Sequence, residues 1–497
     1  MSDDQAPASA GLIPSGSVGL DAVFGGGLTP HRLYLVEGDP GSGKTTLAMQ
    51  FLLAGLARGE SCMFVTLSES EEELRASAVS HGWNLDGIEI VEIIASEQSL
   101  TPDSRYTMFH PSEVELGETI KTVLAEAERI KPALLVFDSL SELRLLAENA
   151  LRYRRQILAL KQHFASRQCT VIFIDDRTSD TGDMHLHSLA HGVISLERET
   201  GEYGVTRRKL QVKKYRGRAY REGFHDFAIR CGGVVVFPRL VAAEHHRDYA
   251  REDVASGLAP LDALLGGGLA RGTSTLILGP AGSGKSSIAT QYAQAAAARS
   301  DHACMFLFEE AIATFLERSA GLGMNLEPLI KSGRLRIQQI DPAELSPGEF
   351  SYLVRTAVEE ENTRVIVIDS LSGYLNAMPS ERLLTLHLHE MLTYLGQQGV
   401  TTIMLMAQHG MVGKMDSPID ASYLADCVMM LRYFEAFGAI RQAISVIKKR
   451  TGKHERTIRE LRLDGGIVIG EPLQDFHGVL SGTPRFVGKD LPQSESE

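Results

Sequence analysis

One long pattern occurs twice in this chain. Residues 15–28 read SGSVGLDAVFGGGL, and residues 256–269 read SGLAPLDALLGGGL. The same offset of 241 residues continues through EGDPGSGKTTL at 37–47 and LGPAGSGKSSI at 278–288. Because self-similarity at a fixed period indicates repeated structural units, the sequence predicts two copies of one domain. Each copy carries a glycine-rich loop that ends in a lysine.

Apolar strands and amphipathic helices alternate in both halves. The strand-like runs LLVFD and TVIFID flank the helix-like RYRRQILALKQHFA, and VIVID and TTIMLM flank ERLLTLHLHEMLTYLG. Alternation of this kind predicts a mainly parallel sheet covered by helices on both faces. We therefore expect two tandem doubly wound α/β domains of the P-loop type, at 1–245 and 246–480, followed by a short polar tail at 481–497.

The two glycine-rich loops match the phosphate-binding pattern G-x-x-x-x-G-K-[ST]. In this pattern the backbone N–H groups at a helix N-terminus face the phosphates, the lysine reaches the β- and γ-phosphates, and the hydroxyl binds Mg²⁺. An apolar strand precedes each loop, as the pattern requires. The predicted ATP-binding residues are Gly38, Gly41, Ser42, Gly43, Lys44, Thr45 and Thr46 in the first half, and Gly279, Gly282, Ser283, Gly284, Lys285, Ser286 and Ser287 in the second.

Each half also has an acid at the end of an apolar strand, Asp138 in LLVFDSLSEL and Asp369 in VIVIDSLSGYL. Such an acid beside a phosphate-binding loop can hold the metal through water. The alternative is an ordinary helix cap at the end of a strand. We predict an Mg²⁺ site formed by Thr45 with Asp138, and a second formed by Ser286 with Asp369.

Candidate catalytic acids follow a neighbouring strand. The second half has Glu309 and Glu310 in MFLFEEA, and the same offset places Ser68 and Glu69 of MFVTLSES opposite them. Paired carboxylates near a phosphate can share proton transfer, because like charges raise one pKa. The first half would then activate water with one carboxylate or by a slower route. The alternative is that these acids are solvated helix starts, where glutamate is favoured.

Basic segments recur late in both halves, VKKYRGRAYREG at 212–223 and IKKRTGKHERTIRE at 447–460. Alternate residues of a strand share a face, so Lys214 would accompany Arg216, and Lys448 would accompany Arg450. Such pairs would neutralise the γ-phosphate on a neighbouring subunit, as arginine fingers do. The alternative is a solvated basic hairpin.

Composition narrows the class of protein further. The net charge is −13, which disfavours a chain-wide nucleic-acid surface. The five cysteines are scattered, as expected for free thiols in a reducing cytoplasm, and no signal peptide or membrane span is predicted. The histidines of MHLHSLAH have no completing cysteine or glutamate, so we assign no transition metal.

Taken together, the paired loops, the FEE of the second half, KYRG and KKRTGKHERTIRE resemble the KaiC family of double RecA-like ATPases over nearly the whole chain. The resemblance implies a two-tiered homohexamer with ATP at the subunit interfaces. It implies that the first tier is a slow ATPase and the second a serine/threonine autokinase and autophosphatase. The predicted trans contacts to ATP are then Lys214, Arg216, Lys448, Arg450 and His454.

The chain departs from the family pattern at several positions. The family's adjacent Ser–Thr phosphoacceptors correspond here to Ser422 and Tyr423, and Ser422 would alternatively cap a turn. Ser68 replaces one acid of the first half, and Tyr220 stands where the family often has histidine. The segment to which the clock's activating partner binds is nearly absent, which disfavours a timekeeping role and leaves a KaiB-like or signalling partner as the expectation.

Two other functions compete with this interpretation. A recombinase-like DNA-binding ATPase would need basic loops after TVIFID and TTIMLM. The first loop instead has Asp175, Asp176, Asp180 and Asp183 against Arg177 alone, and the second has one lysine, which disfavours phosphate binding. A nucleotide-switched scaffold without kinase activity would differ from our leading hypothesis only in its output.

Overall fold

The computed structural model describes residues 11–93, 111–147, 149–176, 184–201, 204–376, 381–408, 422–480 and 484–487. The chain divides into two compact units, Met1–Arg239 and Leu240–Glu497. The segment after the division belongs to the second unit: Ala242 N–H donates to Glu390 Oε2 at 3.2 Å, and the Gln398 side chain donates to the carbonyl of His245 at 2.6 Å.

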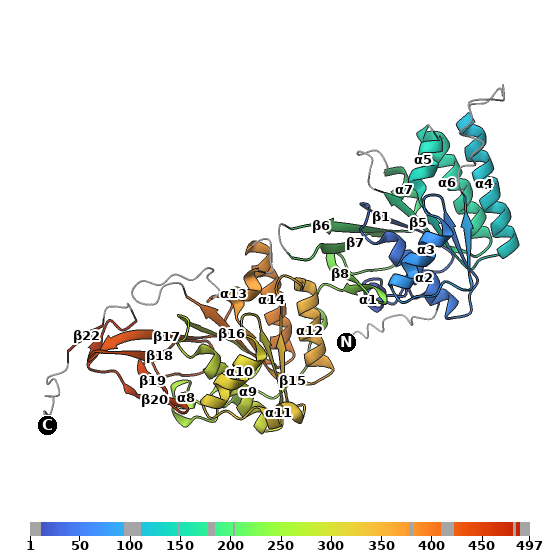
Figure 1. Cartoon of the computed structure of the whole chain (residues 1–497). Helices are drawn as coiled ribbons and strands as arrows, with labels where there is room; N and C mark the ends of the chain where they lie inside the picture. Colours follow the sequence, from blue (N-terminus) through green and yellow to red (C-terminus); the bar gives the residue numbers. More distant parts are fainter. Residues whose placement is uncertain are drawn as a thin grey trace, which may run out of the picture. The chain divides into compact units, whose positions relative to one another are not determined.

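The first unit has a nine-stranded sheet in the order β3-β2-β4-β5-β1-β6-β7-β8-β9. The strands from β3 to β6 in this order are parallel, and β7 to β9 continue the sheet antiparallel. Figure 1 shows helices on both faces of this sheet. Its strands are β1 (Leu33–Gly38), β2 (Cys62–Thr66), β3 (Ile88–Glu92), β4 (Leu134–Asp138), β5 (Thr170–Asp176), β6 (Gly192–Glu199), β7 (Arg207–Tyr215), β8 (Phe224–Arg230) and β9 (Gly233–Phe237). Its helices are α1 (Val18–Val23), α2 (Lys44–Leu56), α3 (Glu71–Ser80), α4 (Pro111–Ile130), α5 (Leu140–Ala147), α6 (Ala150–Ser166) and α7 (Met184–Leu189).

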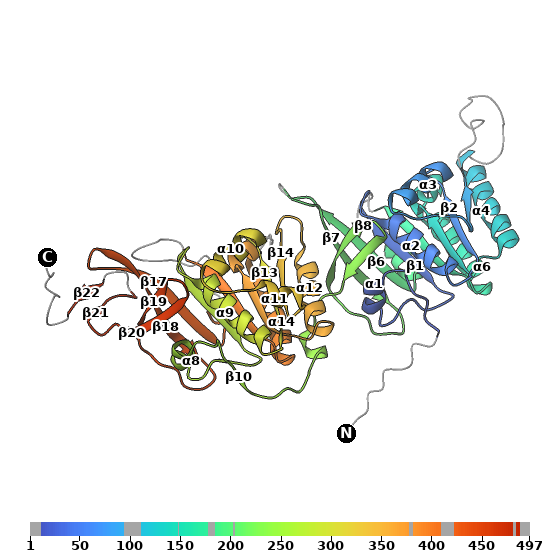
Figure 2. The same cartoon turned by 60° about the horizontal axis from the view of Figure 1, so that its bottom comes forward.

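The second unit repeats this order as β14-β13-β15-β16-β12-β17-β18-β19-β20, again parallel through β17 and antiparallel beyond it (Figure 2). The strands are β12 (Ser274–Gly279), β13 (His302–Leu307), β14 (Leu335–Gln339), β15 (Thr363–Asp369), β16 (Thr401–Ala407), β17 (Cys427–Ala436), β18 (Ala439–Lys449), β19 (Arg459–Leu463) and β20 (Ile467–Pro472). The helices are α8 (Ala259–Leu264), α9 (Lys285–Ala298), α10 (Ile312–Gly321), α11 (Glu327–Lys331), α12 (Pro347–Glu359), α13 (Leu371–Asn376) and α14 (Glu381–Gln397). Small elements complete it: η2 (Ala242–Glu244), β10 (Asp253–Val254), β11 (Leu269–Ala270), β21 (Phe476–His477) and β22 (Arg485–Phe486).

Each sheet is buried on both faces, which explains why its strands are continuous apolar runs. Along β1, Tyr34 and Val36 join the core on one face, while Leu33 and Leu35 join the core on the other. Along β12, Ile277 and Leu278 divide between the two faces in the same way. The prediction of two tandem doubly wound α/β domains is confirmed.

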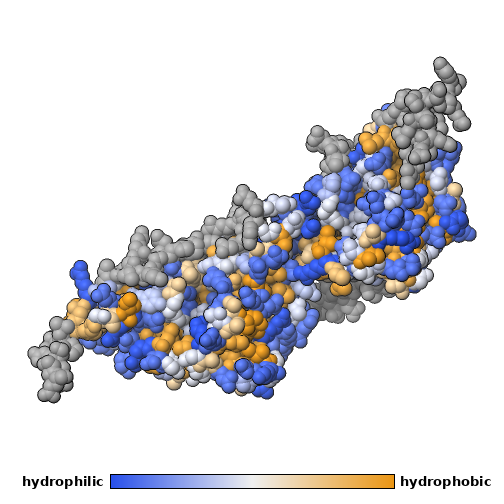
Figure 3. Space-filling view, in the orientation of Figure 1, coloured by the Kyte–Doolittle hydropathy of each residue, from blue (hydrophilic) through white to orange (hydrophobic). Residues whose placement is uncertain are grey.

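No helix in the described part of the chain is long and apolar enough to cross a membrane. On the face seen in Figure 3, hydrophilic and hydrophobic residues are interspersed over both units. The sheet topology matters most for function, because open α/β sheets bind ligands beyond the carboxyl ends of their parallel strands.

Candidate functional site

The glycine-rich loop of each unit follows the central strand and leads directly into a helix. Gly43 precedes α2 with φ 102°, and Gly284 precedes α9 with φ 94°. This left-handed conformation strains any other residue. A Cβ at Gly43 would also lie 2.6 Å from Ile229 Cδ1. Each loop therefore presents the free N–H groups at the start of one long helix, beyond the carboxyl ends of the parallel strands, as an anion site requires.

The two loop lysines are buried and fold back over their own loops. Lys44 Nζ donates to the carbonyl of Gly38 at 2.9 Å, and Lys285 Nζ donates to the carbonyl of Gly279 at the same distance. Burial lowers the pKa of Lys285, and the charges of Asp369 and Glu309 act in the opposite direction. Each lysine is thus positioned at the start of its loop, beside the path that phosphates would take.

A hydroxyl and a carboxylate meet beside each loop. Thr45 Oγ1 donates to Asp138 Oδ2 at 2.7 Å, and burial raises the pKa of Asp138 to about 6 despite this bond. Burial likewise raises the pKa of Asp369, which accepts a hydrogen bond from Ser286. Mg²⁺ prefers oxygen ligands and usually binds through one or two carboxylates and substrate phosphates. Both donor sets fit Mg²⁺, because each contains a buried carboxylate whose pKa stays raised, so that the nearby positive charge does not offset the effect of burial.

The candidate acids of the second unit are held differently from each other. Glu309 Oε1 accepts from the hydroxyl of Ser370 at 2.7 Å. Glu310 accepts two hydrogen bonds from Arg318, at 3.1 and 2.8 Å, and Arg318 also donates to Ser287 Oγ at 3.3 Å. The pair of acids is therefore connected to both the end of β15 and the start of α9.

The first unit has only Glu69 at this place. Backbone hydrogen bonds confirm the equivalence of the two regions, since Leu67 N–H donates to the Asp138 carbonyl and Phe308 N–H donates to the Asp369 carbonyl. Ser68 therefore stands opposite Glu309, as the sequence offset predicts. Burial and the charge of Glu73 raise the pKa of Glu69.

Sequence reasoning missed two side chains of these sites. Asp176, at the end of β5, pairs with Lys44 at 2.8 Å. Arg318, on α10, pairs with Glu310. Asp176 carried a signal, because it ends the apolar run TVIFIDD as Asp138 and Asp369 end theirs. Arg318 lies eight residues beyond its partner, and no short motif links the two.

The predicted trans residues lie toward the end of each sheet where the central strand begins, whereas the P-loop follows the end of that strand. Lys214 pairs in register with Val193, which lies beside Leu35 of β1. Lys448 pairs with Val428, which lies beside Leu276 of β12. Three strand residues, about 10 Å at 3.3 Å per residue, still separate each of these positions from the end of β1 or β12. Arg216 and Arg450 lie still further along, beyond β7 and β18.

The predicted phosphoacceptors lie beside the basic residues of the second unit. Lys448 Nζ donates to the carbonyl of Ser422 at 2.9 Å, and Arg450 donates to the carbonyl of Tyr423 at 3.0 Å. Tyr423 is 52% exposed. His454 is half-buried in the segment after β18. The structure thus brings the predicted acceptors and the basic residues together, and brings neither to the P-loop of the same unit.

Most residues of the loops considered for DNA binding, including Arg177, Asp180 and Asp183, lie outside the described residues. Among the described residues of the first loop, Asp175 pairs with Arg144 at 2.6 Å.

The histidines of MHLHSLAH include His187, which bonds Glu37 at 2.7 Å, and Lys213 bonds the same carboxylate at 2.7 Å. Burial raises the pKa of Glu37, but these two bonds lower it to about 2. His187 therefore contributes to the hydrogen-bond network around Glu37.

Two P-loops, each with a hydroxyl–carboxylate pair at the carboxyl ends of a doubly wound sheet, define a double ATPase of the RecA-like class. A family profile described as "ATPase: KaiC" matches residues 13–241 and 254–474. The chain therefore belongs to the KaiC ATPase family.

Curated relatives match along almost the entire chain. The circadian clock protein KaiC3 of Synechocystis sp. is 27% identical over 496 residues, covering 98% of this chain and 96% of the relative. The circadian clock oscillator protein KaiC of Thermostichus vulcanus is 26% identical over 494 residues, covering 98% and 94%. The chain is similar to these proteins throughout both halves.

Proposed function

We propose that this KaiC-family ATPase is an Mg²⁺-dependent, ring-forming autokinase, a homohexamer in which each P-loop lies at a subunit interface. The first half hydrolyses ATP slowly, with Glu69 as its only candidate general base. The second half transfers phosphate to Ser422 or Tyr423 of a neighbouring copy. The chain would thereby report its nucleotide state to a signalling partner.

The observation that carries this proposal is the separation of Ser422 from Lys285 within one unit. Lys448 Nζ donates to the Ser422 carbonyl near the beginning of β12. Lys285 instead follows the other end of β12, at the start of α9. A phosphate held by Lys285 is therefore far from the acceptors of its own unit, and the proposal assigns its transfer to an acceptor on another copy. A head-to-tail ring satisfies this geometry, because a heterologous interface repeats and closes.

The proposed transfer uses groups of two copies. The hydroxyl oxygen of Ser422 bonds to the γ-phosphorus, the bond to the bridging oxygen of ADP breaks, and the proton passes to Glu309 or Glu310 of the copy that holds ATP. Lys448 and Arg450 balance charge on the γ-phosphate, as basic residues do in phosphoryl transfer. When bound, Mg²⁺ would neutralise phosphate charge beside Ser286 and Asp369.

The first test is peptide mass spectrometry after incubating the purified chain with Mg-ATP, beside a Lys285→Ala control. The proposal predicts phosphate on Ser422 or Tyr423 that is absent from the control. ATP consumption without any phosphopeptide would leave a double ATPase and refute the kinase assignment.

Mixed subunits test transfer between copies. Chains with Lys285→Ala keep their acceptors, and chains with Ser422→Ala and Tyr423→Phe keep their second P-loop. Neither variant alone should become phosphorylated, whereas a mixture should carry phosphate on the Lys285→Ala chain. A mixture that stays unphosphorylated while the wild type is phosphorylated would show that transfer occurs within one chain.

A further inference from the structure

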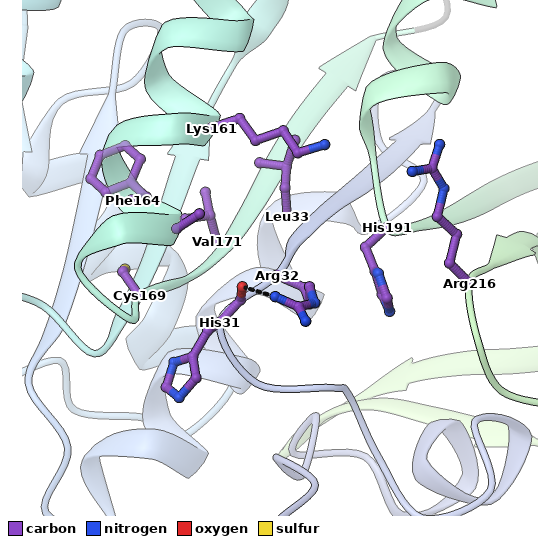
Figure 4. A pocket seen from close by; sticks show the side chains of 10 residues that line it. His31, Arg32, Leu33, Lys161, Phe164, Cys169, Val171, His191 and Arg216 are labelled. Atoms are coloured by element: carbon purple, nitrogen blue, oxygen red, sulfur yellow. Dashed lines mark hydrogen bonds between the residues drawn. The ribbon is translucent and has the colours of Figure 1, made fainter.

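A cavity of about 240 Å³ lies in the first unit where strands β1 and β5 begin. The P-loop follows the other end of β1. Arg32, Lys161, Phe164, His191 and Arg216 are among the residues that line the cavity. Figure 4 shows the Lys161 ammonium and the Arg216 guanidinium on opposite sides of the backbone segment that leads to His191, with Arg32 nearby. Three cationic side chains from three parts of the chain thus line one small cavity.

The positive charge of this pocket has no carboxylate partner within the part of the chain that the structure describes. Lys161 Nζ donates to the carbonyl of Leu189 at 2.6 Å, and Arg216 donates to the carbonyl of Ser188 at 2.7 Å. Arg32 donates to the carbonyl of His31 at 3.2 Å. Burial, together with the charges of Arg216 and Arg32, lowers the pKa of Lys161. Because like charges held together cost free energy, this cluster favours an anion.

His191 adds a polar side chain to the lining of this cavity. Its Nε2 is buried and has no hydrogen-bond partner among the residues that the structure describes. Burial and the nearby charges of Arg32, Arg216, Lys161 and Lys214 lower the pKa of His191 to about 4, so the ring is neutral at pH 7. A buried polar atom normally has a partner, and a neutral imidazole that donates from Nε2 would complete the site for an anion.

The second unit has lost this charge at the equivalent positions. His191 N–H donates to the Leu33 carbonyl, and Asp426 N–H donates to the Ser274 carbonyl in the same place. Matching backbone hydrogen bonds place Thr273 opposite Arg32. The carbonyls of Phe164 and Leu395 also accept equivalent hydrogen bonds. Lys161 lies three residues before Phe164 and Leu392 three residues before Leu395, so these two residues stand opposite each other.

Only the arginine is kept in the second unit, and there it is neutralised. Arg450 stands opposite Arg216 and pairs with Asp426 at 3.2 Å. The same fold therefore has, among the described residues, a cationic pocket without a carboxylate partner in one copy and an internal ion pair in the other. Folding does not require the cationic pocket, which points to binding as the reason for it.

We propose that this pocket of the first unit binds a phosphate group through Arg32, Lys161, His191 and Arg216. Arginine and lysine are the usual phosphate ligands, and arginine binds phosphate with two parallel bonds. The volume lies below the roughly 300–1,000 Å³ of pockets for drug-sized ligands, so it suits a small anion better than a whole nucleotide. The choice of phosphate rests on the proposed function, because ATP hydrolysis supplies it, either as released inorganic phosphate or as the terminal phosphate of ATP on a neighbouring copy.

Isothermal titration with sodium phosphate at constant ionic strength tests the site. The full chain with Lys44→Ala and Lys285→Ala serves as the background, so that neither P-loop competes. Adding Arg32→Thr with Lys161→Leu copies the residues of the second unit, which its fold accommodates, and should weaken phosphate binding at least tenfold. The matched control is Lys121→Leu, which removes an exposed lysine of α4 that pairs with Glu118 and should leave the affinity unchanged.

An NMR titration of His191 provides an independent readout. Phosphate should raise the pKa of His191, because a bound anion stabilises the imidazolium. Equal phosphate affinity in the pocket variant and the Lys121→Leu control, or a His191 pKa that phosphate leaves unchanged, would overturn the proposal.

The two sources of phosphate are separated by ATP hydrolysis in a Lys285→Ala background. If the pocket receives the terminal phosphate of a neighbour's ATP, Arg32→Thr with Lys161→Leu lowers the initial rate. If it receives released phosphate, the initial rate is unchanged and inhibition by added phosphate disappears. Either outcome supports a phosphate site. A wild type that binds phosphate but hydrolyses no ATP would refute the proposed function while leaving the site intact.

Discussion

The two P-loop sites of this chain share a backbone but differ in the side chains around it. In the first unit, Lys44 pairs with Asp176 and one acid, Glu69, follows β2. In the second unit, Ala407 occupies the position of Asp176 and two acids follow β13. The strand ends therefore act as fixed positions, and substitutions at those positions alone can give each copy a different chemistry.

The difference extends to the groups that hold the acids. Arg318 bonds Glu310 and reaches Ser287 in the second unit, whereas Ser77 stands at the equivalent offset in the first. The pKa of Glu69 is instead raised by burial and by the charge of Glu73. An acid positioned by an arginine beside the P-loop suits phosphate transfer to a defined hydroxyl, and a lone acid suits the slower activation of water.

Removing the acids gives the largest expected effect. Glu309→Gln with Glu310→Gln should lower phosphotransfer roughly 10²–10⁴-fold, the usual contribution of a general base, while ATP binding and assembly persist. Phosphopeptide yield, nucleotide binding and size-exclusion chromatography measure the three properties. Glu69→Gln should leave phosphotransfer intact and slow hydrolysis in a Lys285→Ala background.

The matched control for these acids is Glu327→Gln, an exposed acid of α11 that pairs with Lys331. It should retain full phosphotransfer. If the double variant also loses its assembly, the two acids are structural and the proposed contrast between the halves is wrong.

The pH dependence of the free energy of unfolding should distinguish the two units at the place of His191, which is Asp426 in the second unit. Because the pKa of His191 falls to about 4 from 6.5 on folding, the unfolded chain binds more protons between these values. The free energy of unfolding of the first unit should therefore rise with pH across that window and fall as the pH drops through it. His191→Gln should flatten this dependence, and the exposed His246→Gln should not.

Trp83, the only tryptophan, lies in the first unit, so its fluorescence during denaturant unfolding of the full chain follows that unit from pH 4 to 7. An identical pH dependence in His191→Gln and the wild type would show that the cationic pocket does not hold His191 neutral. The second unit, with Asp426 at this position, offers no counterpart.

Much of this architecture could be predicted from the sequence, because glycine-rich loops, apolar runs and strand-end acids are local signals. The offset of 241 residues paired Ser68 with Glu309 correctly. The partnerships of Arg318 and Asp176 could not be found in this way, since they depend on how α10 and β5 pack beside the loops. The cationic pocket was equally hidden, because Arg32, Lys161 and Arg216 lie far apart in the sequence and meet only where β1 and β5 begin.

The smallest expected effect concerns the helix that follows each acid. Ser70 caps α3 reciprocally: its hydroxyl accepts from Glu73 N–H at 3.2 Å, and the Glu73 carboxylate accepts from Ser70 N–H at 2.8 Å. Ala311 precedes α10 and makes no side-chain cap. Ser70→Ala should lower the free energy of unfolding of the first unit by about 1 kcal/mol, again followed by Trp83 fluorescence.

Two substitutions complete this comparison of the helix starts. Ser77→Ala, an exposed change in the middle of α3, should stay within about 0.5 kcal/mol of the wild type. Ala311→Ser supplies the missing cap and should stabilise the second unit by up to about 1 kcal/mol, measured by thermal unfolding of the full chain. If Ser70→Ala costs no more than Ser77→Ala, the cap does not stabilise α3. The position of Glu69 would then depend on the two hydrogen bonds that its backbone makes with the Thr66 hydroxyl, at 2.7 and 3.1 Å.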